Sequence, residues 1–92
     1  MVTVWKYELN ADVNVLSLPR GAQFLQAQVQ YGMPIIWALV DPECEPEERR
    51  LLVVGTGEPF QAAMHDIVHR GTFQMDNGHL VYHVFEVFNL PF

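Results

Sequence analysis

Residues 22–41 of the chain, AQFLQAQVQYGMPIIWALVD, decide the fold. Two apolar strand-like runs flank a Tyr31-Gly32 turn, and the second run, residues 34–40, is apolar on both of the faces that a strand presents. A strand of this kind is covered on both sides, either by the rest of its own domain or by another copy of the chain. The stretch therefore predicts a central strand of a packed β structure.

The two-residue period of half-buried strands recurs over most of the chain. The pattern predicts strands at residues 2–9, 13–18, 23–30, 33–40, 51–54, 71–75 and 79–87. The strand at 23–30 should have one apolar face and one solvated amide face, formed by Leu25, Ala27 and Val29 and by Gln26, Gln28 and Gln30. Before the last strand, the Asn77-Gly78 pair predicts a type I′ turn, because both central residues of that turn need positive φ.

Residues 58–69 form the one segment with a helical pattern of apolar residues, and Pro59 suits a first helical turn. We therefore expect a single domain, residues 1–92, that is mostly β. Its architecture should be a small antiparallel β-sandwich or partly open barrel of about seven strands with one short helix. Long strands in a small domain leave free edges that invite pairing, so a homo-oligomer is expected as well.

Charge and composition limit the classes of ligand and partner that the protein could bind. Five basic against eleven acidic residues give a net charge of −6, which argues against general DNA or RNA binding. A small anion held by one or two arginines, or a basic protein partner, remains compatible with this charge. The single Cys44 fits a reducing compartment. No signal peptide or apolar run of about 18 residues occurs, so we expect a soluble, cytoplasmic protein without membrane contact.

Four residues are candidates for ligand binding. Arg20, at a turn, and Arg70, beside a glycine, are the cations best placed for a small anion, although either also suits a solvated surface. His83 lies among apolar residues, as a hydrogen-bonded core histidine or a ligand contact would. Trp37 suits a core or interface anchor, and its indole would also stack on a nucleobase.

Two further features have a plain and a functional interpretation. The loop Gly55-Thr56-Gly57 follows a strand and is either an ordinary turn or a phosphate cradle, and the acidic Glu58 after it opposes an anion. His65 and His69 would share one face of the predicted helix, with Asp66 beside them. That spacing is similar to a zinc-protease helix, although two histidines also suit a polar helix face. No cofactor is predicted, and the absence of an assembled catalytic constellation argues against an enzyme.

Six short motifs occur in an order that resembles one family. They are Trp5-Lys6-Tyr7-Glu8-Leu9, Leu18-Pro19-Arg20-Gly21-Ala22, Trp37-Ala38-Leu39-Val40-Asp41-Pro42, Gly55-Thr56-Gly57, Gly71-Thr72-Phe73 and His83-Val84-Phe85-Glu86. The pattern resembles small phage- and prophage-encoded proteins of unknown function, over nearly the whole chain. The resemblance implies a phage origin and a stand-alone protein of about this length, and it supplies no activity. That family usually has histidine where this chain has Glu58.

The leading hypothesis is therefore a small phage accessory protein that acts by binding in the host cytoplasm. It would be a host-defence antagonist that sequesters a nucleotide signal at an oligomer interface, using Arg20, Trp37, Arg70 and His83. An inhibitor that binds a host protein is the alternative that the acidic charge favours. A metal-dependent hydrolase that uses His65, Asp66 and His69 is the third hypothesis.

Overall fold

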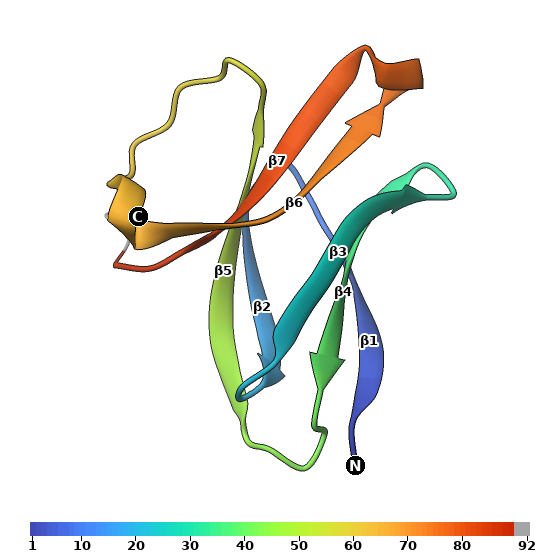
Figure 1. The fold of residues 1–92 in the computed structure, drawn as a ribbon, viewed down its shortest axis with the longest axis vertical. Coiled ribbons are helices and arrows are strands. Elements are labelled where there is room, and N and C mark those ends of the chain that lie inside the picture. Colours follow the sequence, from blue (N-terminus) through green and yellow to red (C-terminus); the bar gives the residue numbers. More distant parts are fainter. Residues whose placement is uncertain (90–92) are drawn as a thin grey trace.

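The computed structural model describes residues 1–89 and contains seven strands in two antiparallel sheets (Figure 1). The strands are β1 (Thr3–Glu8), β2 (Asp12–Pro19), β3 (Gln23–Gln30), β4 (Met33–Val40), β5 (Pro46–Gly55), β6 (Ile67–Met75) and β7 (Leu80–Val87). Every predicted strand is present, and the predicted antiparallel β-sandwich is confirmed. Two strands start earlier than expected, β5 because residues 46–50 pair with β2 and β6 because residues 67–69 pair with β7.

The two strands that are apolar on both faces lie inside their sheets. One sheet has the order β1-β4-β3 and the other has the order β2-β5-β7-β6. In β4, Ile35 and Ile36 point to opposite faces and are both almost fully buried. In β5, all four residues from Leu51 to Val54 are buried. The prediction of central strands is therefore confirmed, because β4 and β5 each have a strand on both sides.

The two sheets come together where β3 lies against β6 (Figure 1). A Cβ atom placed on Gly71 of β6 would lie only 2.8 Å from the Cβ of Ala27 in β3. Both strands carry a β-bulge beside this point, between Phe24 and Gln26 and between His69 and Gly71. A bulge bends its strand and increases the local twist. The bulges and the missing side chain of Gly71 thus allow the two strands to pack closely.

The bulge in β3 changes which side chains of that strand face the core, compared with the prediction. Leu25 was expected in the core, but it is the extra residue of the bulge and is 51% exposed. Phe24 points inward in its place, and Ala27 is buried as predicted. Beyond the bulge, Gln26 and Gln28 lie opposite Trp37 and Ile35 on the outer face of the sheet. The amide face is therefore present, whereas the prediction for Leu25 is wrong.

The predicted helix at residues 58–69 is absent. Only a 3-10 turn, Met64–Asp66, occurs there, and β6 begins at the next residue. The Phe60 ring packs on the Phe85 ring of β7 at 5.7 Å between centroids, and Ile67 pairs with Val87. These contacts with the sheet override a weak local preference for helix. They also show that the chain itself contributes to covering the second apolar face of the four-stranded sheet.

Two hairpins have turns in which consecutive residues have positive φ, and in the β6–β7 turn these residues are Asp76, Asn77 and Gly78. At Asn77 and Gly78 the φ angles are 54° and 85°, and the His79 amide donates to the Asp76 carbonyl at 3.0 Å. This confirms the predicted type I′ turn. The β3–β4 hairpin turns in a similar way at Tyr31 and Gly32, with φ angles of 51° and 79°.

A Tyr31→Asn substitution is expected to raise the free energy of unfolding by about 0.5–1 kcal/mol. Tyr31 is fully exposed and makes little contact that could compensate for its left-handed backbone. Asparagine tolerates that conformation better than tyrosine, because its short side chain bonds to the local backbone. Urea unfolding of the two proteins measures the difference. A loss of stability would show that the tyrosine ring contributes contacts that outweigh the strain.

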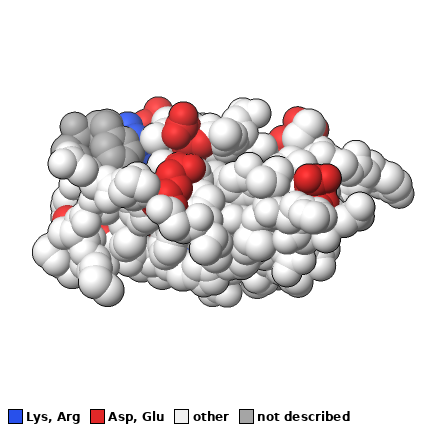
Figure 2. Space-filling view, turned by 90° about the horizontal axis from the view of Figure 1, so that it is seen from above, with Lys and Arg blue, Asp and Glu red and all other residues white. Residues whose placement is uncertain are grey.

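One side of the sandwich remains open. In the described part of the chain, β1 and β2 are edge strands that have no partner on their outer side, whereas the other two edge strands, β3 and β6, contact one another. A short turn after Leu9 joins β1 to β2. Exposed apolar residues follow both edges; they are Val2, Val4, Trp5, Val13 and Val15. Seen from above, the surface is largely uncharged with scattered acidic groups (Figure 2). Within residues 1–89, no helix is long and apolar enough to cross a membrane.

Candidate ligand-binding site

Four polar side chains on the outer face of the four-stranded sheet form a continuous series of hydrogen bonds. Thr56, just after β5, contacts Nε2 of His83 through its hydroxyl oxygen at 2.7 Å. Nδ1 of His83 contacts the hydroxyl of Thr72 at 3.1 Å, and this hydroxyl also contacts Nε2 of His69 at 2.9 Å. We call this series the His–Thr chain. It joins β5, β6 and β7 through side chains alone.

The strand register explains why these residues meet. Thr72 lies directly opposite His83 in the β6–β7 ladder, and side chains of opposite residues are neighbours on one face of a sheet. His69 precedes the β6 bulge, which puts it on the same face as Thr72 although the two are three positions apart. The bulge therefore assembles a cluster that a regular strand would split between two faces.

The His–Thr chain consists of groups that both donate and accept hydrogen bonds. A hydroxyl has one proton, so Thr72 donates to one imidazole and accepts an N–H from the other. The Thr56 hydroxyl lies 3.5 Å from the Val81 carbonyl, the acceptor at one end of the series. None of the four groups is a carboxylate, so the cluster presents neutral or positive chemistry on an otherwise acidic protein.

Aromatic rings lie beside the His–Thr chain. The His69 ring meets the Phe85 ring edge to face at 5.5 Å, and the Phe60 ring also packs on Phe85. Phe60 is 37% exposed, so part of its ring faces solvent. An exposed aromatic ring next to hydrogen-bonding groups is the combination that binds planar polar ligands.

The Gly55-Thr56-Gly57 loop forms a turn. The Thr56 amide donates to the Val81 carbonyl at 3.1 Å, and the Glu58 amide donates to the Gly55 carbonyl at 3.0 Å. Both amides are therefore committed to the fold. The loop contributes the side chain of Thr56 instead, and it borders an open pocket of about 380 Å³. The pocket is lined by Gly55, Thr56, Glu58, His79, Leu80, Val81 and Tyr82.

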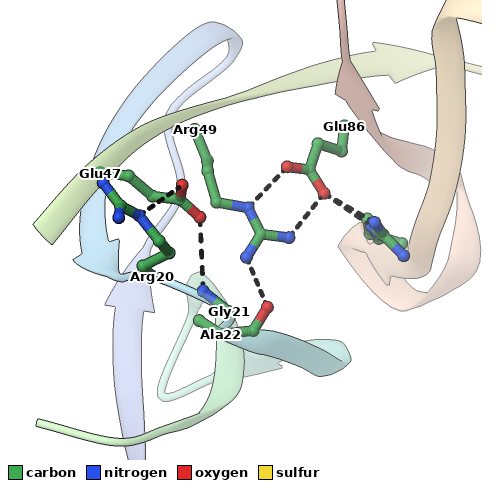
Figure 3. A network of polar contacts seen from close by, with 7 residues as sticks. Arg20, Gly21, Ala22, Glu47, Arg49 and Glu86 are labelled. Carbon is green, nitrogen blue, oxygen red and sulfur yellow. Dashed lines mark hydrogen bonds and ion pairs between the residues drawn. The ribbon is translucent and has the colours of Figure 1, made fainter. Parts of the chain in front are cut away.

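A second polar cluster is buried between the sheets (Figure 3). Arg49 donates from Nε and Nη2 to the two carboxylate oxygens of Glu86, at 2.6 and 2.8 Å. Arg70, the extra residue of the β6 bulge, donates to Oε1 of the same carboxylate at 3.0 and 2.7 Å. Arg49 also donates to the Ala22 carbonyl, and both guanidinium groups lie over the Phe24 ring. Glu86 is only 1% exposed.

Opposite charges hold this cluster in its ionised form. Burial alone would raise the pKa of Glu86, but hydrogen bonds and positive charge from Arg49 and Arg70 outweigh burial and lower that pKa. The hydrogen bond to Glu86 raises the pKa of Arg49, against the opposing effect of burial. The cluster joins β5, β6 and β7 to Ala22, the residue just before β3, and so has a structural role.

The four predicted ligand-binding residues lie in different places. Arg70 is committed to Glu86, and Arg20, at the exposed turn after β2, lies 3.9 Å from Glu47. Trp37 lies on the outer face of the other sheet, between Lys6 and Gln26 in the strand register. His83 belongs to the His–Thr chain. Within one copy of the chain, these four residues therefore do not form a common pocket.

The sequence does not predict several residues of the two clusters. Thr72 meets His83 through the strand register, and Phe60 meets Phe85 through the docked loop, and neither contact leaves a local signal in the sequence. Glu86 did leave a signal, because it follows Tyr82 and Val84 at a spacing of two on a core-facing strand. A carboxylate in such a series needs cationic partners in the core.

The predicted metal ligands are also separated, because the helix that would have placed them on one face does not form. His65 lies in the 3-10 turn with its side chain 83% exposed, 3.5 Å from the Asp66 carboxylate. His69 lies in β6 and bonds to Thr72. In the part of the chain from 1 to 89, no group of three or more histidine, cysteine or acidic residues is arranged to hold a metal ion.

Comparison with known proteins supplies a family but no activity. No curated protein and no solved structure matches the chain. One family matches, over residues 1–90. The chain therefore belongs to the family described as "Domain of unknown function (DUF7352)".

Proposed function

We propose that this protein is a phage accessory protein that acts by binding, and that its ligand is a small phosphorylated molecule such as a nucleotide. The supporting observation is the His–Thr chain. Imidazole N–H groups and threonine hydroxyls would exchange their mutual hydrogen bonds for bonds to phosphate oxygens, because hydrogen bonds to ionised acceptors are stronger than those between neutral groups. The series contains no carboxylate, and Thr56 brings the Gly55-Thr56-Gly57 turn into contact with His83.

The aromatic neighbours support a ligand with a planar base. Phe85 adjoins His69 and packs on Phe60, so a phosphate at the His–Thr chain would leave a base within reach of the exposed Phe60 ring. Stacking on an aromatic ring is favourable for every nucleobase, by about 1–3 kcal/mol per base. This arrangement supports nucleotide sequestration more directly than the scattered positions of Arg20 and Trp37 do.

We also propose that the protein forms a homo-oligomer through its open side. The unpaired edges of β1 and β2 expose backbone groups and apolar side chains, and such edges pair readily with further strands. Trp37 and Arg20, which are remote from the His–Thr chain in one copy, would reach a ligand only across an interface between copies.

The open side favours a second candidate function, that of an inhibitor that binds a host protein. A free edge accepts an extended segment of another protein as an additional strand, and the exposed Val4 and Val13 would contact its side chains. The net charge of −6 would attract a basic partner. Release of a bound nucleotide from the purified protein, detected by mass spectrometry, would favour sequestration over this candidate.

The binding proposal predicts that adenosine 5′-monophosphate shifts the imidazole NMR signals of His69 and His83. Replacing His83 with glutamine, or Thr72 with valine, should weaken binding at least tenfold, since either change removes hydrogen bonds that act on a charged acceptor, worth about 1.5–3 kcal/mol each. Titration of the imidazole C–H resonances measures both effects.

The matched control is His65→Gln, which changes an exposed histidine outside the His–Thr chain. It should bind like the unmodified protein, and circular dichroism should show the same β content for all variants. Equal binding by the His83→Gln and His65→Gln proteins, or no shift with millimolar nucleotide, would refute the proposal.

A further inference from the structure

The pocket beside Thr56 is bordered by the exposed carboxylate of Glu58. Oε2 of Glu58 lies 3.7 Å from the position of a Cβ on Gly55, and the Tyr82 ring lies 3.8 Å from the same point. The carboxylate and the Tyr82 ring therefore both lie beside Gly55. Among residues 1–89, no side chain makes a hydrogen bond or an ion pair with it.

The other charged groups near this face have partners of their own. On β5, Arg50 lies 3.8 Å from Glu48, and in the 3-10 turn Asp66 lies near His65 and accepts from Asn89 at 3.3 Å. Glu58 is thus the acidic group that borders the pocket, and it shares that pocket with Thr56 of the His–Thr chain.

A carboxylate and a phosphate repel, so Glu58 must meet a different part of the ligand. An ionised carboxylate only accepts hydrogen bonds, and two neighbouring hydroxyl groups offer it two donors. In a nucleotide, the ribose with its 2′ and 3′ hydroxyls directly follows the 5′-phosphate. Acidic residues bind ribose hydroxyls in the same way in dinucleotide-binding folds.

We infer that Glu58 binds the vicinal diol of a ribose, which makes the site selective for ribonucleotides over deoxyribonucleotides. The inference rests on the proposed phosphate binding at the His–Thr chain. Thr56 belongs to both features and is only two residues from Glu58, so a phosphate at Thr56 puts the attached sugar into the pocket. The pocket volume, about 380 Å³, lies within the range of small-ligand sites, about 300–1,000 Å³.

The test compares adenosine 5′-monophosphate with its 2′-deoxy analogue in the same NMR titration. The unmodified protein should bind the ribonucleotide about tenfold more tightly, because one charge-assisted hydrogen bond is lost with the 2′ hydroxyl. In the Glu58→Ala protein the two ligands should bind equally, whatever the absolute affinity becomes when the negative charge is removed. The ratio of the two affinities is therefore the decisive quantity.

Glu43→Ala is the matched control, since it removes an exposed carboxylate from the loop between β4 and β5. This variant should keep the preference for ribose. Equal binding of both nucleotides by the unmodified protein would overturn the role of Glu58 and leave phosphate binding intact. If neither nucleotide moves the His69 and His83 signals, both this inference and the proposed function are wrong.

Discussion

The Glu86→Ala variant is expected to lose about 3–5 kcal/mol of its free energy of unfolding. The change leaves the guanidinium groups of Arg49 and Arg70 close together, largely buried and without their shared carboxylate. An uncompensated buried charge is far more costly than a missing contact, because it has lost its hydration as well. A small domain has only about 5–15 kcal/mol to lose, so the midpoint of urea unfolding should fall steeply.

The matched control is Glu48→Ala, which breaks the exposed pair with Arg50. That pair is solvated on both sides, and its loss should cost less than about 1 kcal/mol. Similar losses in the two variants would mean that water reaches Glu86 and that the cluster does not stabilise the core.

The cluster of Glu86 with Arg49 and Arg70 also makes the free energy of unfolding depend on pH. The pKa of Glu86 is lower in the folded protein than its ordinary value of 4.5, so the unfolded chain binds the proton more readily. The stabilisation is fully present above pH 4.5 and is lost as the pH falls below that value toward the folded-state pKa. The difference in stability between the unmodified and Glu86→Ala proteins should therefore shrink on acidification.

Replacing Gly71 with alanine is expected to cost about 1–3 kcal/mol, the usual penalty for inserting a carbon into a packed core. The new Cβ would lie 2.8 Å from the Cβ of Ala27 and 3.1 Å from its backbone nitrogen. Because part of the clash is with backbone, β3 and β6 must move apart to relieve it. Thermal unfolding followed by circular dichroism measures the loss.

Gly55→Ala is the matched control, because the nearest atoms to its added Cβ lie at 3.7 Å or more. That variant should retain the original stability. Combining Gly71→Ala with Ala27→Gly removes the closer of the two clashes and should restore part of the loss caused by Gly71→Ala. A destabilisation equal in the Gly55 and Gly71 variants would point to glycine flexibility and not to the contact between the sheets.

Local patterns were sufficient to predict the strands, because alternation and turn residues act over a few positions. The Asn77-Gly78 turn and the central position of β4 follow directly from such patterns. The bulges do not, since one extra residue changes no composition and arises from the contact between β3 and β6. For the same reason Leu25 was assigned to the core, although the bulge turns it outward.

The candidate site was predictable only in part. His83 and the loop around Thr56 are each recognisable in the sequence, and each also has an ordinary structural interpretation. Only the strand register brings them together with Thr72. The helix expected at residues 58–69 does not form, because the packing of Phe60 on Phe85 stabilises this segment more than helical hydrogen bonds would. Contacts between distant segments carry no signature in a single sequence.

The open side of the sandwich also governs how the protein behaves at high concentration. At neutral pH, a net charge of −6 makes copies repel one another and limits contact between the free edges of β1 and β2. Near the isoelectric point, about pH 4.9, that repulsion vanishes while the unpaired edges and their valines remain. Colloidal stability is thus lowest under mild acid, where strand-to-strand assembly would proceed unopposed.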